Sequence, residues 1–539
     1  MIPAAALDHL DRLVARRMAE ARTPGLALAI AGREGALHEA TFGTADPETG
    51  APVTPGTLFS IGSAGKALAA VAALQAHEAG LLDLHAPVAA VLPWFRVQSR
   101  FAPITAHHLL THTSGLVRGN DLAPDARAIA WALRDTETGF PPGERCHYSD
   151  AGYKLLGLAL EAATGRPYGD LLRRGIFRPL GMDATEPALT HAIRPRMARG
   201  YAPLYDDRPA HASHPLVPAP WVETDSADGA IAATAGDAAR FVRMLLAGGR
   251  GPAGAVLSPE SFRLLTRPWI EGDDSIWGHA GYGLYVFQRG GSAMVGHGGD
   301  TPGYEAYLMA DLDLGYGVAL LAAQPYPPGL IRGVLDVVQA ALRGQPLPEL
   351  PAPSDPARVD DAAAYAGRYG TRTAPGALVL RARGDRLLLA VDGDEAALEA
   401  RGPDRFYVNH PRFDRHLLSF GRDEAGRVVE AWHGAGWYPA EGVAFPPAPD
   451  VPAGWQAYPG HYRSFSPWES NFRVLLRRGK LLLAWPEGDE EPLVPAGPAA
   501  FRVGEEPWLP ERLRFGPIVD GQAWGADLSG GQYSRAFTP

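Results

Sequence analysis

The chain has 539 residues, too many for one hydrophobic core, and this length predicts three or four folding units. Its net charge of −10 at pH 7 argues against a surface for nucleic acid or anionic membrane, and 46% hydrophobic with 20% charged residues is typical of soluble globular proteins. The single cysteine, Cys146, excludes an intrachain disulfide, and no apolar run approaches the roughly 20 residues that span a bilayer.

The first part of the chain predicts an α+β domain. Residues 4–23 carry leucines and arginines at helical spacing and lack the apolar core of a signal peptide, so we expect a cytoplasmic protein. Segments 25–30 and 36–43 predict a hairpin, 67–76 predicts a helix, and more helices are expected to about residue 246. Predicted strands at 283–288, 293–295, 304–310 and 317–323 precede a last helix at 331–343. We therefore expect an antiparallel sheet flanked by helices and completed by both ends of residues 1–345.

The remainder of the chain predicts two related β modules. Residues 346–356 are rich in proline and read as a linker. Beyond it the sequence repeats: YAGRY at 365–369 returns as YPGHY at 458–462, and GDRLLLA at 384–390 returns as GKLLLA at 479–484. Short strands separated by glycine and proline favour small antiparallel barrels, at 357–446 and 453–539.

Ser63 and Lys66 form the candidate nucleophile. Three residues apart at the start of a helix, they share one face, and the helix N-terminus supplies a positive field. A lysine with a lowered pKa can take the proton that keeps a serine hydroxyl unreactive. The chain has only three lysines, which favours a need for a removable proton here. The alternative is a helix serine followed by a solvated lysine.

The histidines at 107, 108 and 112 and the single cysteine are weaker candidates for a functional site. His107, His108 and His112 lie close together, but no cysteine or well-spaced carboxylate accompanies them, so no metal site and no cofactor are expected. Cys146 is expected to be a small buried residue rather than a nucleophile.

An ordered series of motifs resembles the serine β-lactamase and penicillin-binding protein superfamily. The series is Ser63-x-x-Lys66, LLTHTSGL at 109–116, Tyr148-Ser149-Asp150, PLGM at 179–182 and GHGG at 296–299. It is most similar to the branch of class C β-lactamases, D-alanyl-D-alanine carboxypeptidase B, family VIII esterases and D-aminopeptidases (peptidase family S12). The layout also resembles the three-domain D-aminopeptidases, with a β-lactamase-like domain followed by two lipocalin-like β modules.

The resemblance implies a role for each matching residue. Ser63 is the acylating serine and Lys66 shares its proton. Tyr148 activates serine and then water, as a phenolate or through a lysine relay, and a phenol can do so only if cations such as Lys66 lower its pKa. His297 is expected to be a neutral or switchable hydrogen-bond donor near the substrate or Tyr148, rather than a fixed cation. The small Gly298 and Gly299 are expected to let substrate approach the strand. The backbone N–H groups of Ser63 and Asp300 would form the oxyanion hole.

One position departs from the family pattern. The family usually has asparagine where this chain has Asp150, which as a carboxylate only accepts hydrogen bonds. Asp150 is expected either to pair with Lys66 and hold it charged, or to favour a substrate that presents an amine.

The function expected from the sequence is a serine hydrolase that forms a covalent acyl-enzyme. Its substrate would be a small molecule or short peptide, either a D-amino-acid peptide or amide or a small carboxylic ester. The alternative is a penicillin-binding or β-lactamase-like protein with little or no turnover. Neither nucleic acid nor a membrane is expected as a partner, and a homo-oligomer is possible.

Overall fold

The structure is a computed structural model that describes residues 2–119, 125–273, 275–324, 329–370 and 377–536. It contains two compact units. The first comprises Met1–Ala202, Leu216–Pro351 and Ser466–Trp468, and the second comprises Pro203–Pro215, Ala352–Phe465 and Glu469–Pro539. None of the described helices is long and apolar enough to cross a membrane.

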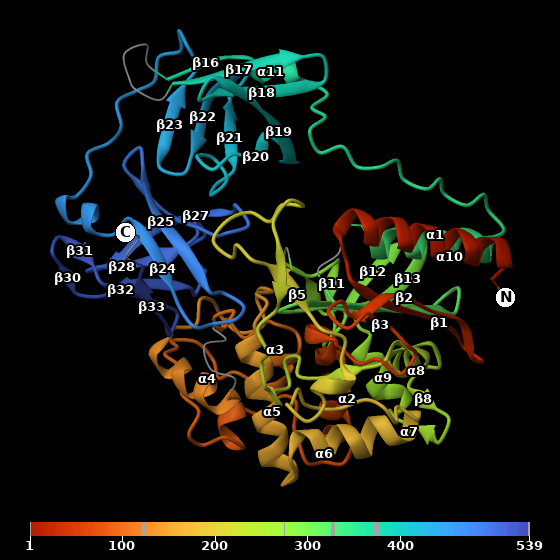
Figure 1. The fold of residues 1–539 in the computed structure, drawn as a ribbon. Coiled ribbons are helices and arrows are strands. Elements are labelled where there is room, and N and C mark those ends of the chain that lie inside the picture. Colours follow the sequence, from red (N-terminus) through yellow and green to blue (C-terminus); the bar gives the residue numbers. More distant parts are fainter. Residues whose placement is uncertain (1, 120–124, 274, 325–328, 371–376, 537–539) are drawn as a thin grey trace. The chain divides into compact units, whose positions relative to one another are not determined.

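The first unit is built on a nine-stranded antiparallel sheet in the order β10-β11-β12-β13-β14-β15-β1-β2-β3 (Figure 1). The N-terminal hairpin of β1 and β2 joins the C-terminal strands because β1 pairs with β15, from Leu26 opposite Ala322 to Gly32 opposite Tyr316. Both ends of the domain therefore complete the sheet, as predicted. The strands are β1 (Gly25–Gly32), β2 (Ala36–Asp46), β3 (Ala51–Pro52), β10 (Ile270–Glu271), β11 (His279–Ala280), β12 (Tyr285–Arg289), β13 (Ser292–Thr301), β14 (Tyr304–Asp311) and β15 (Tyr316–Ala322).

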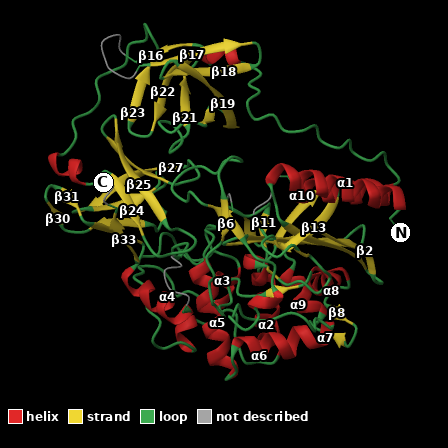
Figure 2. Ribbon diagram, viewed as in Figure 1, coloured by secondary structure: helices red, strands yellow, loops and turns green. Residues whose placement is uncertain are grey.

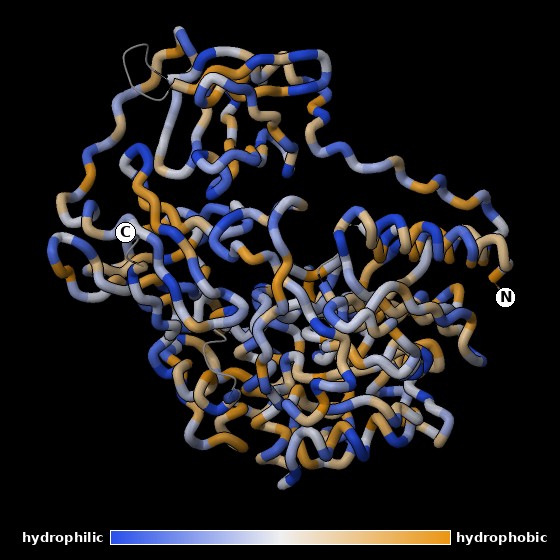
Figure 3. The backbone as a smooth tube through the Cα atoms, in the orientation of Figure 1, coloured by the Kyte–Doolittle hydropathy of each residue, from blue (hydrophilic) through white to orange (hydrophobic). Residues whose placement is uncertain are grey.

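Helices cover both faces of this sheet, and β1 shows why (Figure 2). All eight residues of β1 are buried. Its larger side chains, Leu26, Leu28 and Ile30, pack with α1 (Ala4–Ala21) and α10 (Leu330–Arg343), whereas its alanines pack with the other helices. Hydrophobic and hydrophilic residues alternate along α1, as expected for a helix with one buried face (Figure 3).

The helices on the alanine side of β1 carry the candidate site. They are α2 (Gly65–Glu78), α3 (Ala106–Leu110), α4 (Ala126–Ala132), α5 (Asp150–Thr164), α6 (Tyr168–Leu172), α7 (Arg178–Leu180), α8 (Ala235–Leu246) and α9 (Pro259–Leu265). The residues of α2 are almost all buried, so this helix forms the centre of the larger core.

The second unit contains two eight-stranded antiparallel sheets, each with its own core. The first runs in chain order: β16 (Gly367–Tyr369), β17 (Leu378–Arg383), β18 (Arg386–Val391), β19 (Asp394–Gly402), β20 (Arg405–Val408), β21 (Leu418–Arg422), β22 (Val428–His433) and β23 (Gly436–Pro439). The second is a closed barrel of β24 (Gly460–Arg463), β25 (Asn471–Arg477), β26 (Lys480–Ala484), β27 (Glu490–Gly497), β28 (Ala500–Val503), β29 (Arg512–Phe515), β32 (Gly525–Leu528) and β33 (Gly531–Arg535). The prediction of barrel-like antiparallel modules is confirmed.

The sequence repeat corresponds to a repeated structural detail. The hydroxyl of Tyr369 donates to the backbone oxygen of Tyr365 at 2.8 Å, and that of Tyr462 donates to the oxygen of Tyr458 at 2.7 Å. The bulge in β19 before Gly402 also recurs in β27 before Gly497. The repeated YxGxY segment therefore ties the first strand of each module to the end of the short helix before it, α11 (Ala362–Tyr365) in the first module and the 3₁₀ helix η6 (Ala453–Ala457) in the second.

Candidate active site

The candidate nucleophile lies in a 3₁₀ turn rather than in the helix itself. Ser63 is the middle residue of the turn η1 (Gly62–Ala64), which joins β4 (Phe59–Ser60) to α2. Lys66 is the second residue of α2, and its side chain is fully buried. The i, i+3 spacing brings Lys66 Nζ to 2.9 Å from Ser63 Oγ, as the sequence predicts.

Three acceptors surround the Lys66 ammonium group. Besides Ser63 Oγ, they are Asp150 Oδ1 at 2.5 Å and the backbone oxygen of Asp228 at 2.8 Å. An ammonium group has three N–H donors and no lone pair, so this arrangement matches the charged form of lysine. The geometry shows the first role expected for Asp150, pairing with Lys66, and the second, recognition of a substrate amine, stays a prediction.

The start of α5 orients Asp150 and Tyr148. Ser149 is the N-cap of α5, and its Oγ accepts from the backbone N–H of Gly152 at 3.0 Å. Asp150 is the first residue of the helix, and the backbone N–H of Tyr148 donates to Asp273 Oδ2 at 2.7 Å. A short capped segment therefore fixes the two side chains on either side of Ser149.

Tyr148 is a buried neutral phenol. Its ring stacks on His112 with 4.3 Å between ring centroids, and Lys66 Nζ lies 5.0 Å from the centre of the Tyr148 ring. Burial raises the pKa of Tyr148 well above its ordinary value, and the charge of Asp150 raises it further, whereas a hydrogen bond to Ser63 lowers it only in part. The condition for a phenolate, that neighbouring cations lower the pKa of Tyr148, is therefore not met, because desolvation and Asp150 outweigh them.

His297 on β13 is neutral and presents an acceptor. It is buried and stacks on Tyr285 with 4.3 Å between ring centroids. Burial, with a smaller contribution from Lys66, lowers the pKa of His297 to about 3. Its Nδ1 bonds the backbone oxygen of Gly298, an acceptor, so Nδ1 carries the proton and Nε2 is left as an acceptor. The neutral ring agrees with the expectation, and the hydrogen bond from His297 to substrate or Tyr148 stays a prediction.

The glycines after His297 lie in close contact with other parts of the protein. A Cβ added to Gly299 would lie 1.9 Å from the backbone oxygen of Ile61, and one added to Gly298 would lie 2.8 Å from the ring of Tyr307. The approach of substrate to these two glycines, expected from the sequence, stays a prediction. In the structure, the absent side chain of Gly299 lets β13 lie directly against the nucleophile turn.

This close approach brings Asp300 to the nucleophile. A Cβ added to Gly62, whose φ is +49°, would lie 2.8 Å from the backbone nitrogen of Asp300. Ser63 and Asp300 line one small cavity of about 70 Å³, together with Asp150 and Asp228. The two residues expected to form the oxyanion hole therefore lie at the same cavity.

Lys154 and Asp228 are site residues that the sequence reasoning missed. Lys154 Nζ lies 2.7 Å from Asp228 Oδ2, and both residues line the Ser63 cavity. Burial alone would raise the pKa of Asp228, but Lys154 and Lys66 together lower it below its usual value. The signal for Lys154 was available, because it is one of only three lysines in the chain. No motif marks Asp228.

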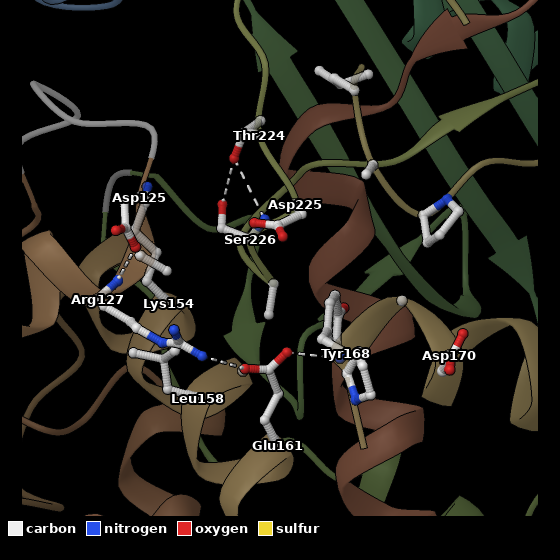
Figure 4. A pocket seen from close by; sticks show the side chains of 18 of the residues that line it. Asp125, Arg127, Lys154, Leu158, Glu161, Tyr168, Asp170, Thr224, Asp225 and Ser226 are labelled. Atoms are coloured by element: carbon white, nitrogen blue, oxygen red, sulfur yellow. Dashed lines mark hydrogen bonds and ion pairs between the residues drawn. The ribbon is translucent and has the colours of Figure 1, made fainter. Parts of the chain in front are cut away.

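A larger cavity of about 620 Å³ adjoins the Ser63 cavity, and Lys154, Thr224 and Ser226 line both of them. Figure 4 shows this second cavity between Asp125, Arg127 and Glu161 on one side and the 224–226 segment on the other. The Ser63 cavity alone holds only a compact group, and the 224–226 segment connects it to the larger cavity.

The remaining candidates have structural partners. His107 Nδ1 lies 2.7 Å from the hydroxyl of Tyr282, and His108 closes the capping box of α3 with Thr105. Cys146 is buried, and burial raises the pKa of its thiol to about 12. Among the described residues, no three His, Cys, Asp or Glu side chains are arranged to hold a metal ion.

Buried neutral histidines predict lower stability in acid. Burial lowers the pKa of His297 to about 3 and that of His107 to about 4. Between these values and about pH 6.5, the unfolded chain binds protons that the folded chain does not, so stability falls as the pH falls. Each such histidine is expected to cost about 1.4 kcal/mol per pH unit in this window.

Urea unfolding at pH 7, 6, 5 and 4 tests this expectation. His297→Asn should reduce the decline relative to the parent, whereas His279→Asn, at an exposed position, should leave it unchanged. Equal pH dependence in the parent and in His297→Asn would contradict the prediction.

Comparisons with known proteins identify the family of the first unit. The family model described as beta-lactamase matches residues 10–341. Penicillin-binding protein 4 of Amycolatopsis lactamdurans is 30% identical over 374 residues, which cover 65% of this chain and 94% of that protein. An octameric penicillin-binding protein homologue from Pyrococcus abyssi has a TM-score of 0.58 at 24% identity and covers 80% of this chain and 99% of its own. The D-amino acid amidase from Ochrobactrum anthropi SV3 has a TM-score of 0.53 at 25% identity and covers 63% of this chain and 99% of its own.

The match of the family model extends over more than half of the chain and includes Ser63, Lys66, Tyr148 and His297. The chain therefore belongs to the beta-lactamase family, as a serine hydrolase of the kind that includes the penicillin-binding proteins.

Proposed function

We propose that this protein hydrolyses amides of D-amino acids, or short peptides that begin with one, through an acyl-enzyme on Ser63. The observation that carries the proposal is the contact of 2.9 Å between Ser63 Oγ and the buried Nζ of Lys66. A charged N–H group that donates a hydrogen bond to a serine oxygen stabilises the negative charge that develops on that oxygen during attack.

The proposed proton path uses Tyr148 as a neutral relay. Ser63 Oγ attacks the carbonyl carbon, and the C=O electron pair moves to the oxygen, where the backbone N–H groups of Ser63 and Asp300 receive it. The Ser63 proton passes to Tyr148 Oη while the Tyr148 proton passes to the leaving nitrogen, and the C–N bond breaks. Water then attacks the ester carbonyl carbon while its proton passes to Tyr148 Oη and the Tyr148 proton passes to Ser63 Oγ, and the C–O bond to Ser63 breaks to release the acid. The hydrogen bond between Tyr148 and Ser63 supports this route, which needs no phenolate.

The substrate class is inferred from the charge at the Ser63 cavity. Three aspartates, Asp150, Asp228 and Asp300, and one lysine, Lys154, belong to the lining, which leaves an excess of carboxylates. Although Asp150 pairs with Lys66, its side chain is still 24% exposed. Such a cavity favours a substrate with a free ammonium group. The similarity to a D-amino acid amidase supports the D configuration. A cavity of about 70 Å³ favours a compact acyl group such as alanyl.

A substrate panel with Ser63→Ala and Asp150→Asn tests the proposal. D-alanine p-nitroanilide, its L enantiomer, p-nitrophenyl acetate and a penicillin are compared by steady-state kinetics. We expect the D-anilide to be preferred and Ser63→Ala to abolish all turnover. Asp150→Asn should lower kcat for every substrate, because Asp150 pairs with Lys66, but should raise KM about tenfold for the D-anilide alone, which corresponds to about 1.4 kcal/mol, with KM for the neutral ester within about threefold.

Each other outcome has a definite meaning. Preference for the neutral ester, unchanged in Asp150→Asn, would replace the amidase proposal by an esterase. A persistent penicillin adduct without turnover of the other substrates would favour a penicillin-binding protein. Turnover that survives Ser63→Ala would reject the nucleophile.

A further inference from the structure

Two of the three lysines in the chain are buried at the site, and only Lys66 belongs to the Ser-x-x-Lys motif. The second, Lys154, lies on α5 four residues after Asp150, and its Nζ is 2.7 Å from Asp228 Oδ2. The side chains are 5% and 13% exposed, so this ion pair is almost fully removed from water.

Both carboxylate oxygens of Asp228 and its backbone oxygen accept hydrogen bonds. Oδ2 accepts from Lys154, and Oδ1 accepts from Ser226 Oγ, which lies 3.0 Å from Thr224 Oγ1 (Figure 4). The backbone oxygen of Asp228 accepts from Lys66 Nζ at 2.8 Å. The Lys154–Asp228 pair thus holds the residue that supplies one of the three acceptors of Lys66.

The next residue contacts the nucleophile turn. A Cβ added to Gly229 would lie 2.8 Å from the carbonyl carbon of Gly62 and 3.2 Å from the backbone nitrogen of Ser63. Residues 228 and 229 therefore touch the Lys66 side chain on one side and the Ser63 backbone on the other. A shift of this segment would displace both at once.

We propose that Lys154 and Asp228 are positioning residues, which hold the 228–229 segment so that Lys66 Nζ and the Ser63 backbone keep their places during acyl transfer. The proposal rests on the proposed function of Ser63. Neither residue has a chemical step of its own.

A role in positioning and a role in stability predict different effects when one or both members of a buried ion pair are replaced. A buried ion pair contributes little net stability compared with an apolar pair of similar shape, because desolvation of the charges offsets their attraction. Removing one partner, in contrast, leaves an uncompensated charge that moves toward water or draws water in. Because the backbone oxygen of Asp228 accepts a hydrogen bond from Lys66 Nζ, a movement of Asp228 would displace Lys66 and so alter its contact with Ser63 Oγ.

Four variants test the proposal: K154M, K154R, D228N and the double variant K154M/D228N. Reactive Ser63 is counted by covalent labelling with a fluorophosphonate and intact mass, and kcat and KM are expressed per reactive serine. K154M should lower kcat about 100-fold with KM within about threefold, since displacing a reacting group by about 1 Å has an effect of this size. K154R, which keeps the charge, should stay within about fivefold of the parent. The double variant should recover at least about tenfold over K154M, because no unpaired charge remains.

Lys480 provides a matched control. It is exposed at the start of β26, so K480M makes the same substitution away from the site and should leave kcat unchanged. An unchanged kcat per reactive serine in K154M would overturn the proposal, even if the melting temperature falls. If K154M does not fold, the test uses D228N and K154R. A kcat lowered about tenfold in D228N, with kcat of K154R near that of the parent, supports the proposal. An unchanged kcat in D228N overturns it.

Failure of the proposed function can be distinguished from failure of the positioning proposal. If the parent labels at Ser63 but turns over no substrate, the proposed function fails, and the rate of fluorophosphonate labelling becomes the readout. Slower labelling of K154M than of K154R would still support positioning, and equal rates would overturn it.

Discussion

Replacing Lys66 by methionine is expected to lower kcat/KM by roughly 1,000-fold or more, with the fold retained. Lys66 Nζ is the donor that contacts Ser63 Oγ at 2.9 Å, and methionine has no donor to replace it. Groups that manage charge and protons in acyl transfer typically contribute about 100- to 10,000-fold. Methionine is close to lysine in shape, so it fills a fully buried site without leaving a large cavity.

The measurement for Lys66→Met is kcat/KM for an anilide and an ester, with circular dichroism to verify the fold. K480M again serves as the matched control at an exposed lysine. A folded Lys66→Met variant that keeps more than a tenth of the parent activity would show that Lys66 is structural.

Gly299→Ala is expected to be the most damaging single-methyl change at the site. Its Cβ would lie 1.9 Å from the backbone oxygen of Ile61 and 2.8 Å from the backbone nitrogen of Ala64, so the strand and the nucleophile turn must separate. Overpacking of this kind costs about 1–3 kcal/mol of the free energy of unfolding. The displacement of Asp300 from Ser63 should lower kcat about 100-fold.

Urea unfolding and steady-state kinetics check both effects in Gly299→Ala. Gly35→Ala is the control, because a Cβ at Gly35 meets no atom within 4 Å and its φ is not positive. A Gly299→Ala protein with parental stability and kcat would mean that the turn does not depend on this close approach.

The sequence predicted those parts of the site that depend on local geometry. The contact between Ser63 and Lys66 follows from their spacing, because residues three apart at a helix start share a face whatever surrounds them. The antiparallel sheet closed by β1 and β15 was predictable because both segments are apolar throughout. The β modules were predictable because the sequence repeats.

What could not be predicted depends on contacts distant in sequence. The pKa of Tyr148 rises because residues from several segments bury its ring, and the neighbouring lysine alone suggested the opposite direction. Gly299 packs on Ile61 across 238 positions of sequence, so its role was attributed to substrate. The Lys154–Asp228 pair joins residues 74 positions apart, and Asp228 belongs to no motif.

The central claim is a covalent acyl-enzyme on Ser63, and intact mass during turnover tests it most directly. The protein is mixed with D-alanine p-nitroanilide and quenched in acid at intervals of milliseconds to seconds. Its intact mass is then measured by mass spectrometry, with Ser63→Ala treated in the same way as the control. We predict an adduct of the mass of one alanyl group, which maps to the peptide that contains Ser63 and is absent from the variant. Hydrolysis that proceeds without an adduct at any time, or an adduct on another residue, would contradict the account.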